Sequence, residues 1–138
     1  MDKRSIMLEH NENPINKGLV NDSDYIKVSA RNESCIDHID IMFKINNNVI
    51  EDIVFDGEAC VIAISSTSLM IKNLINKTIE EALIIINNFE NMIDNKSYDI
   101  DVLGELNVYD EIYKQPSRKM CALLPYIGIK DYLTKKSK

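Results

Sequence analysis

The sequence predicts an α+β fold, in which helices pack on one face of a small antiparallel sheet of about three strands. Segments with a two-residue apolar period come first, and segments with a helical period follow them. Only about three residues separate the second and third of the alternating segments, so these two should form an antiparallel hairpin. Strands followed by helices are typical of the α+β layer arrangement.

Three segments have the alternation of a strand with one buried face. The first runs from Tyr25 to Arg31, the second from His38 to Ile45, and the third from Val49 to about Asp56, ending at Gly57. Three consecutive asparagines, residues 46–48, supply turn chemistry between the second and third. The preceding residues 1–24 are polar, and their one early apolar cluster, residues 6–8, predicts a short helix followed by a loop.

The helical segments lie in the second half of the chain. Residues 60–75 are mostly apolar except for four small hydroxyl residues at 65–68, which let other backbones approach and predict burial on several sides. Thr78 and Glu81 match a capping box that begins a helix reaching Ile93. Residues 94–114 predict a loop or a short helical piece, and a last helix should start near Pro116 and bend at Pro125.

Length and charge restrict the classes of function. The 138 residues predict a single domain spanning 1–138, long enough to form a core without staples. The net charge of −6 argues against nucleic acid or an anionic membrane as the main partner. We also find no apolar run of membrane-spanning length and no secretory signal, so a cytoplasmic location with reduced thiols is expected.

The candidate site residues are three cysteines and one aspartate. Cys35, Cys60 and Cys121 are odd in number, which excludes a complete disulfide framework, and none lies in a CxxC pair. All three fall near the ends of predicted elements, where side chains can converge at one sheet edge. Asp37 adds a possible oxygen ligand, and three sulfurs with one oxygen suit Zn²⁺ or an iron–sulfur cluster. Two alternatives remain: inert buried cysteines, and an ordinary turn or cap carboxylate at Asp37.

Four stretches of the chain, in order, carry a family resemblance. They are Asn13-Pro14…Asn16-Lys17-Gly18…Asn21-Asp22, then Cys35-x-Asp37, then Phe55-x-Gly57-Glu58-Ala59-Cys60-x-Ile62-x-x-Ser65, and finally Pro116-x-Arg118-x-x-Cys121-Ala122. Together they resemble the IscU/SufU family of U-type iron–sulfur cluster assembly proteins, which are related to the N-terminal part of NifU. The resemblance extends from about residue 10 to residue 132 and implies an IscU/SufU-like fold.

Two features make the chain more similar to the SufU branch. The stretch between Cys60 and Cys121 is long, and Met120 occupies the position where IscU scaffolds have a histidine. The chain also departs from the family pattern, with Ala59 where a glycine is usual and with Pro125 inside the final helix. Neither departure removes a presumed ligand.

The resemblance implies a function for the four candidate residues. Cys35, Asp37, Cys60 and Cys121 would hold Zn²⁺, and Cys35 would accept persulfide sulfur from a SufS-type cysteine desulfurase. The same ligands could instead assemble a [2Fe–2S] cluster and pass it to downstream iron–sulfur assembly proteins. A third alternative is a structural zinc module that binds protein.

A zinc site with three thiolates and a carboxylate is net negative and costly to bury, so a nearby cation is expected. Arg118, three residues before Cys121, is the best candidate, and Lys119 and His38 are weaker ones. The alternative for Arg118 is a solvated surface charge.

Overall fold

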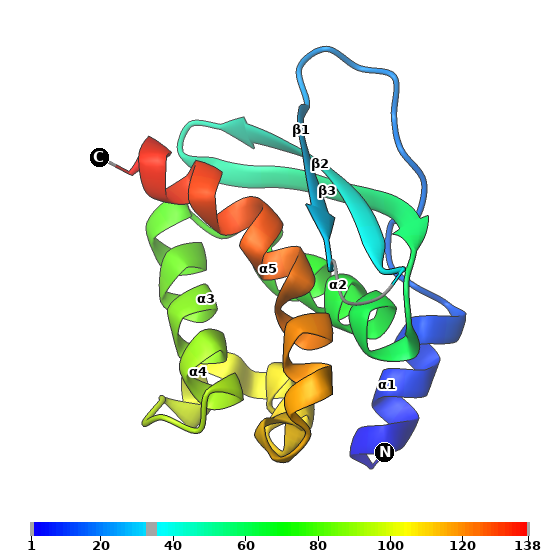
Figure 1. Ribbon diagram of the computed structural model, residues 1–138. Coiled ribbons are helices and arrows are strands. Elements are labelled where there is room, and N and C mark those ends of the chain that lie inside the picture. Colours follow the sequence, from blue (N-terminus) through cyan, green and yellow to red (C-terminus); the bar gives the residue numbers. More distant parts are fainter. Residues whose placement is uncertain (1, 33–35, 138) are drawn as a thin grey trace.

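The computed structural model describes residues 2–32 and 36–137 and has the predicted order of strands and helices (Figure 1). The chain begins with a helix, continues through three strands, and ends with helices of very different length. The elements are α1 (Lys3–Glu12), β1 (Ile26–Arg31), β2 (His38–Asn46), β3 (Val49–Glu58), α2 (Val61–Leu74), α3 (Ile79–Ile93), α4 (Ile100–Leu103), the 3₁₀ helices η1 (Gly104–Tyr109) and η2 (Ile112–Lys114), and α5 (Pro116–Lys136).

The sheet is antiparallel throughout, with the strand order β1-β2-β3. The connection between β2 and β3 is a two-residue turn at Asn47 and Asn48, which have φ angles of 52° and 66°. Positive φ at both central residues is what a type I′ hairpin turn needs, and asparagine tolerates it better than most residues. The predicted hairpin is therefore confirmed, with a turn one residue shorter than expected.

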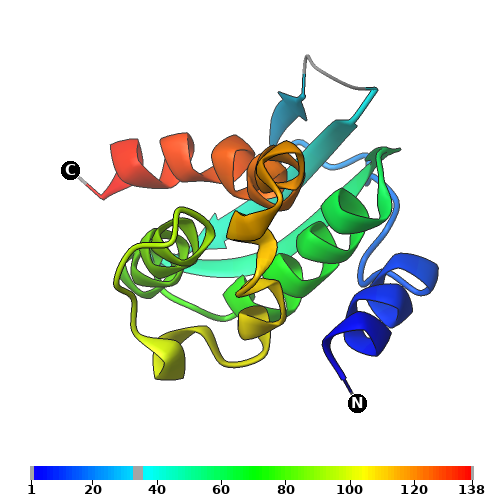
Figure 2. The same cartoon turned by 60° about the horizontal axis from the view of Figure 1, so that its bottom comes forward.

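The helices α2, α3 and α5 cover one face of the sheet, as Figures 1 and 2 show. Ile39, Ile41 and Phe43 of β2 are completely buried against them. On α2, the four hydroxyl residues 65–68 are also completely buried. The prediction of a helix enclosed on several sides is confirmed, because α1, α5 and η1 all contact α2.

Two helix boundaries follow from the sequence as predicted. At the start of α3, Thr78 N donates to Glu81 Oε1 at 2.9 Å and Glu81 N donates to Thr78 Oγ1 at 3.1 Å, which completes the capping box. The last helix begins at Pro116 and contains Pro125, and its axis changes direction along its length (Figure 1). Proline lacks the N–H that the helical ladder requires, which accounts for the change.

The segment between α3 and α5 is short-helical rather than a loop. It carries α4, η1 and η2, and it contributes Tyr109 to the core, where this ring meets Phe89 edge-on at 5.9 Å between centroids. Phe89 in turn stacks on Tyr126 of α5 at 4.1 Å. Within the described ranges 2–32 and 36–137, no helix combines the length and apolarity needed to cross a membrane.

Candidate metal centre

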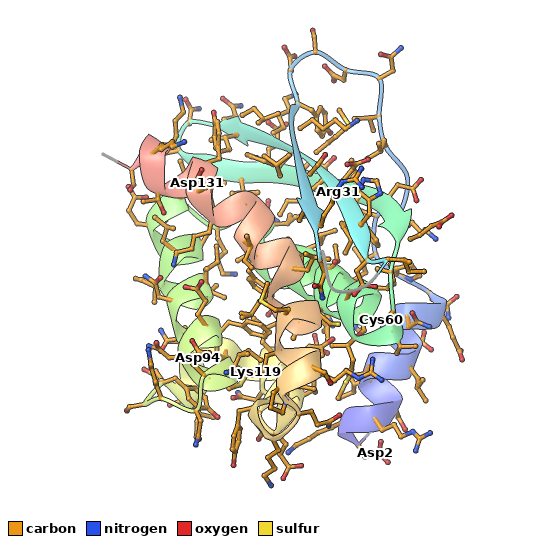
Figure 3. The ribbon with its side chains drawn as sticks, in the orientation of Figure 1. Asp2, Arg31, Cys60, Asp94, Lys119 and Asp131 are labelled. Atoms are coloured by element: carbon orange, nitrogen blue, oxygen red, sulfur yellow. The ribbon has the colours of Figure 1, made fainter. Side chains whose placement is uncertain are left out.

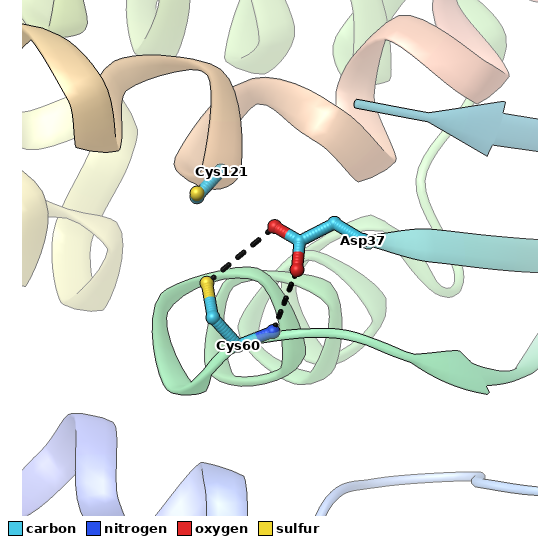
Figure 4. A group of neighbouring side chains, drawn as sticks. All are labelled: Asp37, Cys60 and Cys121. Atoms are coloured by element: carbon cyan, nitrogen blue, oxygen red, sulfur yellow. Dashed lines mark hydrogen bonds between the residues drawn. The ribbon is translucent and has the colours of Figure 1, made fainter. Parts of the chain in front are cut away.

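Three of the four predicted site residues meet at one end of the sheet. One ligand atom from each of Asp37, Cys60 and Cys121 lies within 4.8 Å of the other two. The three residues come from different elements, since Asp37 precedes β2, Cys60 lies between β3 and α2, and Cys121 lies on α5 (Figure 4). Cys35 lies outside the described residues.

The hairpin register places Asp37 beside Cys60. His38 pairs with Glu58, so the residues just beyond this pair lie at the same end of the two strands. Cys60 N donates to Asp37 Oδ1 at 2.9 Å, and Cys60 Sγ donates to Asp37 Oδ2 at 3.5 Å (Figure 4). Asp37 therefore acts as a turn carboxylate, one of the alternatives that the sequence left open, while its second oxygen faces a thiol.

Close approach of the strands at this end depends on Gly57. Its φ is +150°, and a Cβ there would lie 2.1 Å from the carbonyl oxygen of His38. A side chain at position 57 would thus push β3 away from the residue that follows Asp37. The departure at Ala59 has little consequence, because the positive φ before Cys60 falls on Gly57 and not on Ala59.

Cys121 is buried on the opposite wall of the site. Its Sγ donates to the carbonyl oxygen of Ser117 at 3.9 Å and accepts from Asn32 Nδ2 at 4.0 Å. Burial, followed by hydrogen bonds and electrostatic interactions with Cys60 and Asp37, raises the pKa of the Cys121 thiol to about 12. Without a cation the arrangement therefore holds this thiol neutral.

The cluster opens onto a cavity of about 810 Å³. Its walls come from α1, from the segments on either side of β1, from the end of the hairpin opposite its turn, and from the starts of α2 and α5. They include Asn11, Lys17, Ile36, Glu58 and Arg118. Asp37 and Cys121 are buried, whereas Cys60 is partly exposed. Among the described residues, the cluster is therefore enclosed around Asp37 and Cys121 and borders the cavity on the side of Cys60.

The predicted cations differ in their surroundings. Lys119 pairs with Asp94 at 3.1 Å (Figure 3), and His38 pairs with Asp40 at 3.1 Å. Arg118 is exposed, lines the cavity and forms no ion pair with any side chain of the described ranges. Of the three predicted cations, Arg118 is therefore the one that lines the cavity and has no ion pair with a carboxylate of the described residues.

Two residues at the site were not singled out from the sequence. Lys17 lines the cavity because the backbone of its neighbours binds β3: Gly18 N donates to the Phe55 carbonyl at 2.6 Å, and Phe55 N donates to the Asn16 carbonyl at 3.1 Å. Asn32 is buried beside Cys121. Lys17 belongs to the first of the four stretches that resemble the family, so its presence at the site could have been predicted from that resemblance. Asn32 lies in none of these stretches.

The donor set suits a thiophilic metal. Two thiols and one carboxylate within 4.8 Å are the ligand types found at tetrahedral zinc sites, and hard cations such as Mg²⁺ prefer oxygen alone. A metal ion would also remove the obstacle to ionising Cys121, because a coordinated thiol gives up its proton. The residues present therefore fit a metal ion.

Comparison with known proteins gives the family. Residues 2–122 match the sequence model of the NifU-like N-terminal domain. The chain is 35% identical over 133 residues to the zinc-dependent sulfurtransferase SufU of Bacillus subtilis, covering 96% of this chain and 89% of the relative. It is 30% identical over 122 residues to the iron–sulfur cluster assembly scaffold protein IscU of Thermotoga maritima, covering 88% and 85% of the two chains.

Solved structures agree with the sequence comparison. The crystal structure of FiSufU from Fervidobacterium islandicum AW-1 superposes with a TM-score of 0.88 at 30% identity, covering 93% of each chain. A NifU-like N-terminal protein from Brucella abortus superposes with a TM-score of 0.84 at 18% identity, covering 96% of this chain and 94% of the other, and supports the fold alone. The chain therefore belongs to the NifU-like N-terminal domain family, the IscU/SufU family that its four sequence stretches indicated.

Proposed function

We propose that this chain is an iron–sulfur cluster assembly protein that binds Zn²⁺ and accepts sulfur from the persulfide of a SufS-type cysteine desulfurase. The observation that carries the proposal is the cluster of Asp37, Cys60 and Cys121, buried on one side and open to a cavity on the other. The similarity to a SufU protein named as a zinc-dependent sulfurtransferase supports it.

Each ligand has a distinct environment. Cys60, just before α2, and Cys121, on α5, face each other, and Asp37 is held by two hydrogen bonds from Cys60. Cys35 would supply the fourth ligand. Asn32 N donates to the Asp37 carbonyl at 3.0 Å, so the two ends of the segment that carries Cys35 lie beside the cluster. When bound, Zn²⁺ would hold the thiols as thiolates at neutral pH.

Sulfur transfer would proceed by thiol exchange at Cys35. Its thiolate attacks the terminal sulfur of the desulfurase persulfide, and a new S–S bond forms on Cys35. The S–S bond of the donor persulfide breaks, and its electron pair leaves on the desulfurase cysteine as a thiolate, so no external oxidant or reductant is needed. Arg118 and Lys17, which line the cavity, would favour the approach of an anionic persulfide.

Two alternatives use the same ligands. A scaffold would assemble a [2Fe–2S] cluster on them and pass it to downstream iron–sulfur assembly proteins, and the similarity to an IscU named as a scaffold favours this candidate. A structural zinc module would instead need an enclosed site. The 810 Å³ cavity beside the cluster counts against such a module.

Metal analysis and desulfurase kinetics separate these functions. The protein is purified without added metal, its zinc, iron and acid-labile sulfide are measured, and its effect on the turnover of a SufS-type desulfurase is determined. We expect one zinc per chain and faster turnover. Iron with sulfide would favour the scaffold, and tightly bound zinc without any effect on turnover would favour the structural module.

The variants Cys35→Ala and Asp37→Ala test the assigned roles. We expect Cys35→Ala to abolish sulfur acceptance and Asp37→Ala to weaken zinc binding. Asp40→Ala is the matched control, because Asp40 is a neighbouring carboxylate on β2 that bonds Ser29 and His38 instead of the cluster. Full stimulation of the desulfurase by Cys35→Ala would contradict the proposal.

A further inference from the structure

We propose that Ser66 is a positioning residue for the metal centre, because its hydroxyl fixes α5 to α2 and so sets the separation of Cys121 from Cys60. The inference rests on the proposed metal-binding function. It concerns a residue that lies inside the core and does not line the cavity.

The four buried hydroxyls of α2 have different partners, and one of them joins α2, which directly follows Cys60, to α5, which carries Cys121. Ser66 Oγ donates to the carbonyl oxygen of Ala122 at 2.6 Å, and Ala122 directly follows Cys121. Ser65 bonds Tyr109 of η1, and Ser68 bonds His10 and the backbone of Ile15. Among these hydroxyls, Ser66 is therefore the direct polar link from α2 to α5.

Helix α5 needs such a link at this position. In a regular helix the carbonyl of Cys121 accepts from the N–H of residue 125, but that residue is Pro125 and has no N–H. The turn that carries Cys121 therefore lacks one bond of its own ladder. Ser66 of α2 donates to the next carbonyl of this turn, that of Ala122. This bond between the helices therefore helps to hold in place a turn that has lost one of its own hydrogen bonds.

Ligand positions within a metal site must be held closely, because small displacements weaken coordination. Removing a residue that orients a metal ligand without binding the metal itself often lowers metal affinity by an order of magnitude. Cys60 precedes α2 and Cys121 lies on α5, so a shift between these helices changes their separation directly. Ser66 acts on this separation without touching either sulfur.

The neighbouring Thr67 offers a matched control. It is as completely buried as Ser66, but its Oγ1 donates at 2.8 Å to the carbonyl of Ala63 in the same helix. Ser66→Ala and Thr67→Val each remove one buried hydroxyl, and only the first removes a bond between the two helices. Urea unfolding of the metal-free variants, with circular dichroism of each, gives the purely structural cost of both changes.

The test measures metal binding by chelator competition and the absorption spectrum of the Co²⁺-loaded proteins. We expect Ser66→Ala to lower Zn²⁺ affinity about fivefold to tenfold and to shift the Co²⁺ d–d bands, and Thr67→Val to stay within about twofold of the parent with an unchanged spectrum. Equal Zn²⁺ affinities and identical spectra for Ser66→Ala and the parent would overturn the inference.

A second variant tests the part played by Pro125 and keeps the comparison possible if Ser66→Ala alone folds poorly. Pro125→Ala returns an N–H to α5, so adding Ser66→Ala in that background should reduce Zn²⁺ affinity less than it does in the parent. An equal loss in both backgrounds would contradict the argument. Failure of the parent to bind Zn²⁺ or Co²⁺ would contradict the proposed function itself, whereas metal binding without desulfurase stimulation would contradict sulfur transfer and leave the role of Ser66 standing.

Discussion

At the scale of single residues, the neighbouring groups of the site determine whether the Cys121 thiol can ionise. Cys121 is buried beside a carboxylate and a second thiol, and these neighbours all disfavour its ionisation. The same three groups become a favourable set once a dication is present, because its charge compensates theirs. Burial that would make a lone cysteine inert therefore makes this one dependent on a metal for its thiolate.

This dependence predicts a pH effect on metal affinity. Because the pKa of Cys121 is raised to about 12, the thiol is protonated at neutral pH and must release its proton when a metal binds. We expect apparent Zn²⁺ affinity to rise by at least about tenfold for each pH unit near neutrality, with the gain continuing into the alkaline range. Chelator competition at pH 6.5 and 7.5 measures it, and an affinity independent of pH would contradict the assignment of Cys121 as a ligand.

At the scale of elements, the sequence predicts the hairpin of β2 and β3, and with it the proximity of Asp37 to Cys60, but not the position of Cys121. Asn47 and Asn48 identify the turn, and the alternation of residues 38–45 identifies Ile39, Ile41 and Phe43 as buried. It does not predict that Met42 on the opposite face is buried as well, or that Ile45 is only partly buried. Once the register is known, Asp37 must lie near Cys60. The approach of α5 was not predictable in this way, because helix packing depends on side-chain shapes that have no local pattern in the sequence.

The segment 94–114 shows a similar limit on what the sequence alone can predict. It lacks the apolar period of a long helix, so the sequence favoured a loop or a short helical piece. The structure forms three short helices there, and Tyr109 anchors them in the core through Phe89 and Ser65. Leu103, Leu106 and Ile112 are buried in the core as well, so burial against the rest of the fold supports a conformation that the apolar pattern of the segment does not specify.

The element that we expect to be most sensitive is the end of the hairpin at Gly57. Gly57→Ala places a methyl group 2.1 Å from the His38 carbonyl at a φ of +150°, and we expect a loss of about 2–3 kcal/mol in the free energy of unfolding. Gly104→Ala is the control, because Gly104 also has positive φ, +50°, but a Cβ there meets no atom within 4 Å. Its expected cost, from backbone strain alone, is about 1 kcal/mol. Urea unfolding measures both, and equal losses would show that backbone conformation alone, without the close approach, sets the cost.

At the scale of the whole molecule, distant parts of the chain are joined through α2. The N-terminal segment binds this helix at Ser68, whose hydroxyl bonds His10 Nδ1 at 2.7 Å and accepts from Ile15 N at 2.8 Å. The same segment brings Asn11 and Lys17 to the wall of the cavity. The sequence predicted a short helix at the N-terminus but not where it would lie, since a polar helix with a weak apolar stripe does not identify its partner.

The attachment of α1 predicts a loss of stability in acid. Partial burial lowers the pKa of His10 below its ordinary value of 6.5; the charge of Lys72 acts in the same direction, and Glu105 and Glu9 oppose it. The unfolded chain therefore takes up a proton at a higher pH than the folded chain does. The contribution of His10 to stability is complete above about pH 6.5 and is lost as the pH falls from there through the lowered pKa of the folded state.

The variant His10→Asn isolates this contribution, because asparagine places a polar group near the position of Nδ1 but does not titrate. We expect the urea midpoint of the parent to fall more than that of the variant between pH 7.5 and pH 5, with the other titrating groups common to both proteins. If the two midpoints fell in parallel, the protonation state of His10 would have no effect on the attachment of α1 to α2. In that case the attachment of the N-terminal segment would depend on its other contacts, which include the Ile15–Ser68 bond, the Lys3–Asp110 ion pair and the Gly18–Phe55 backbone bond.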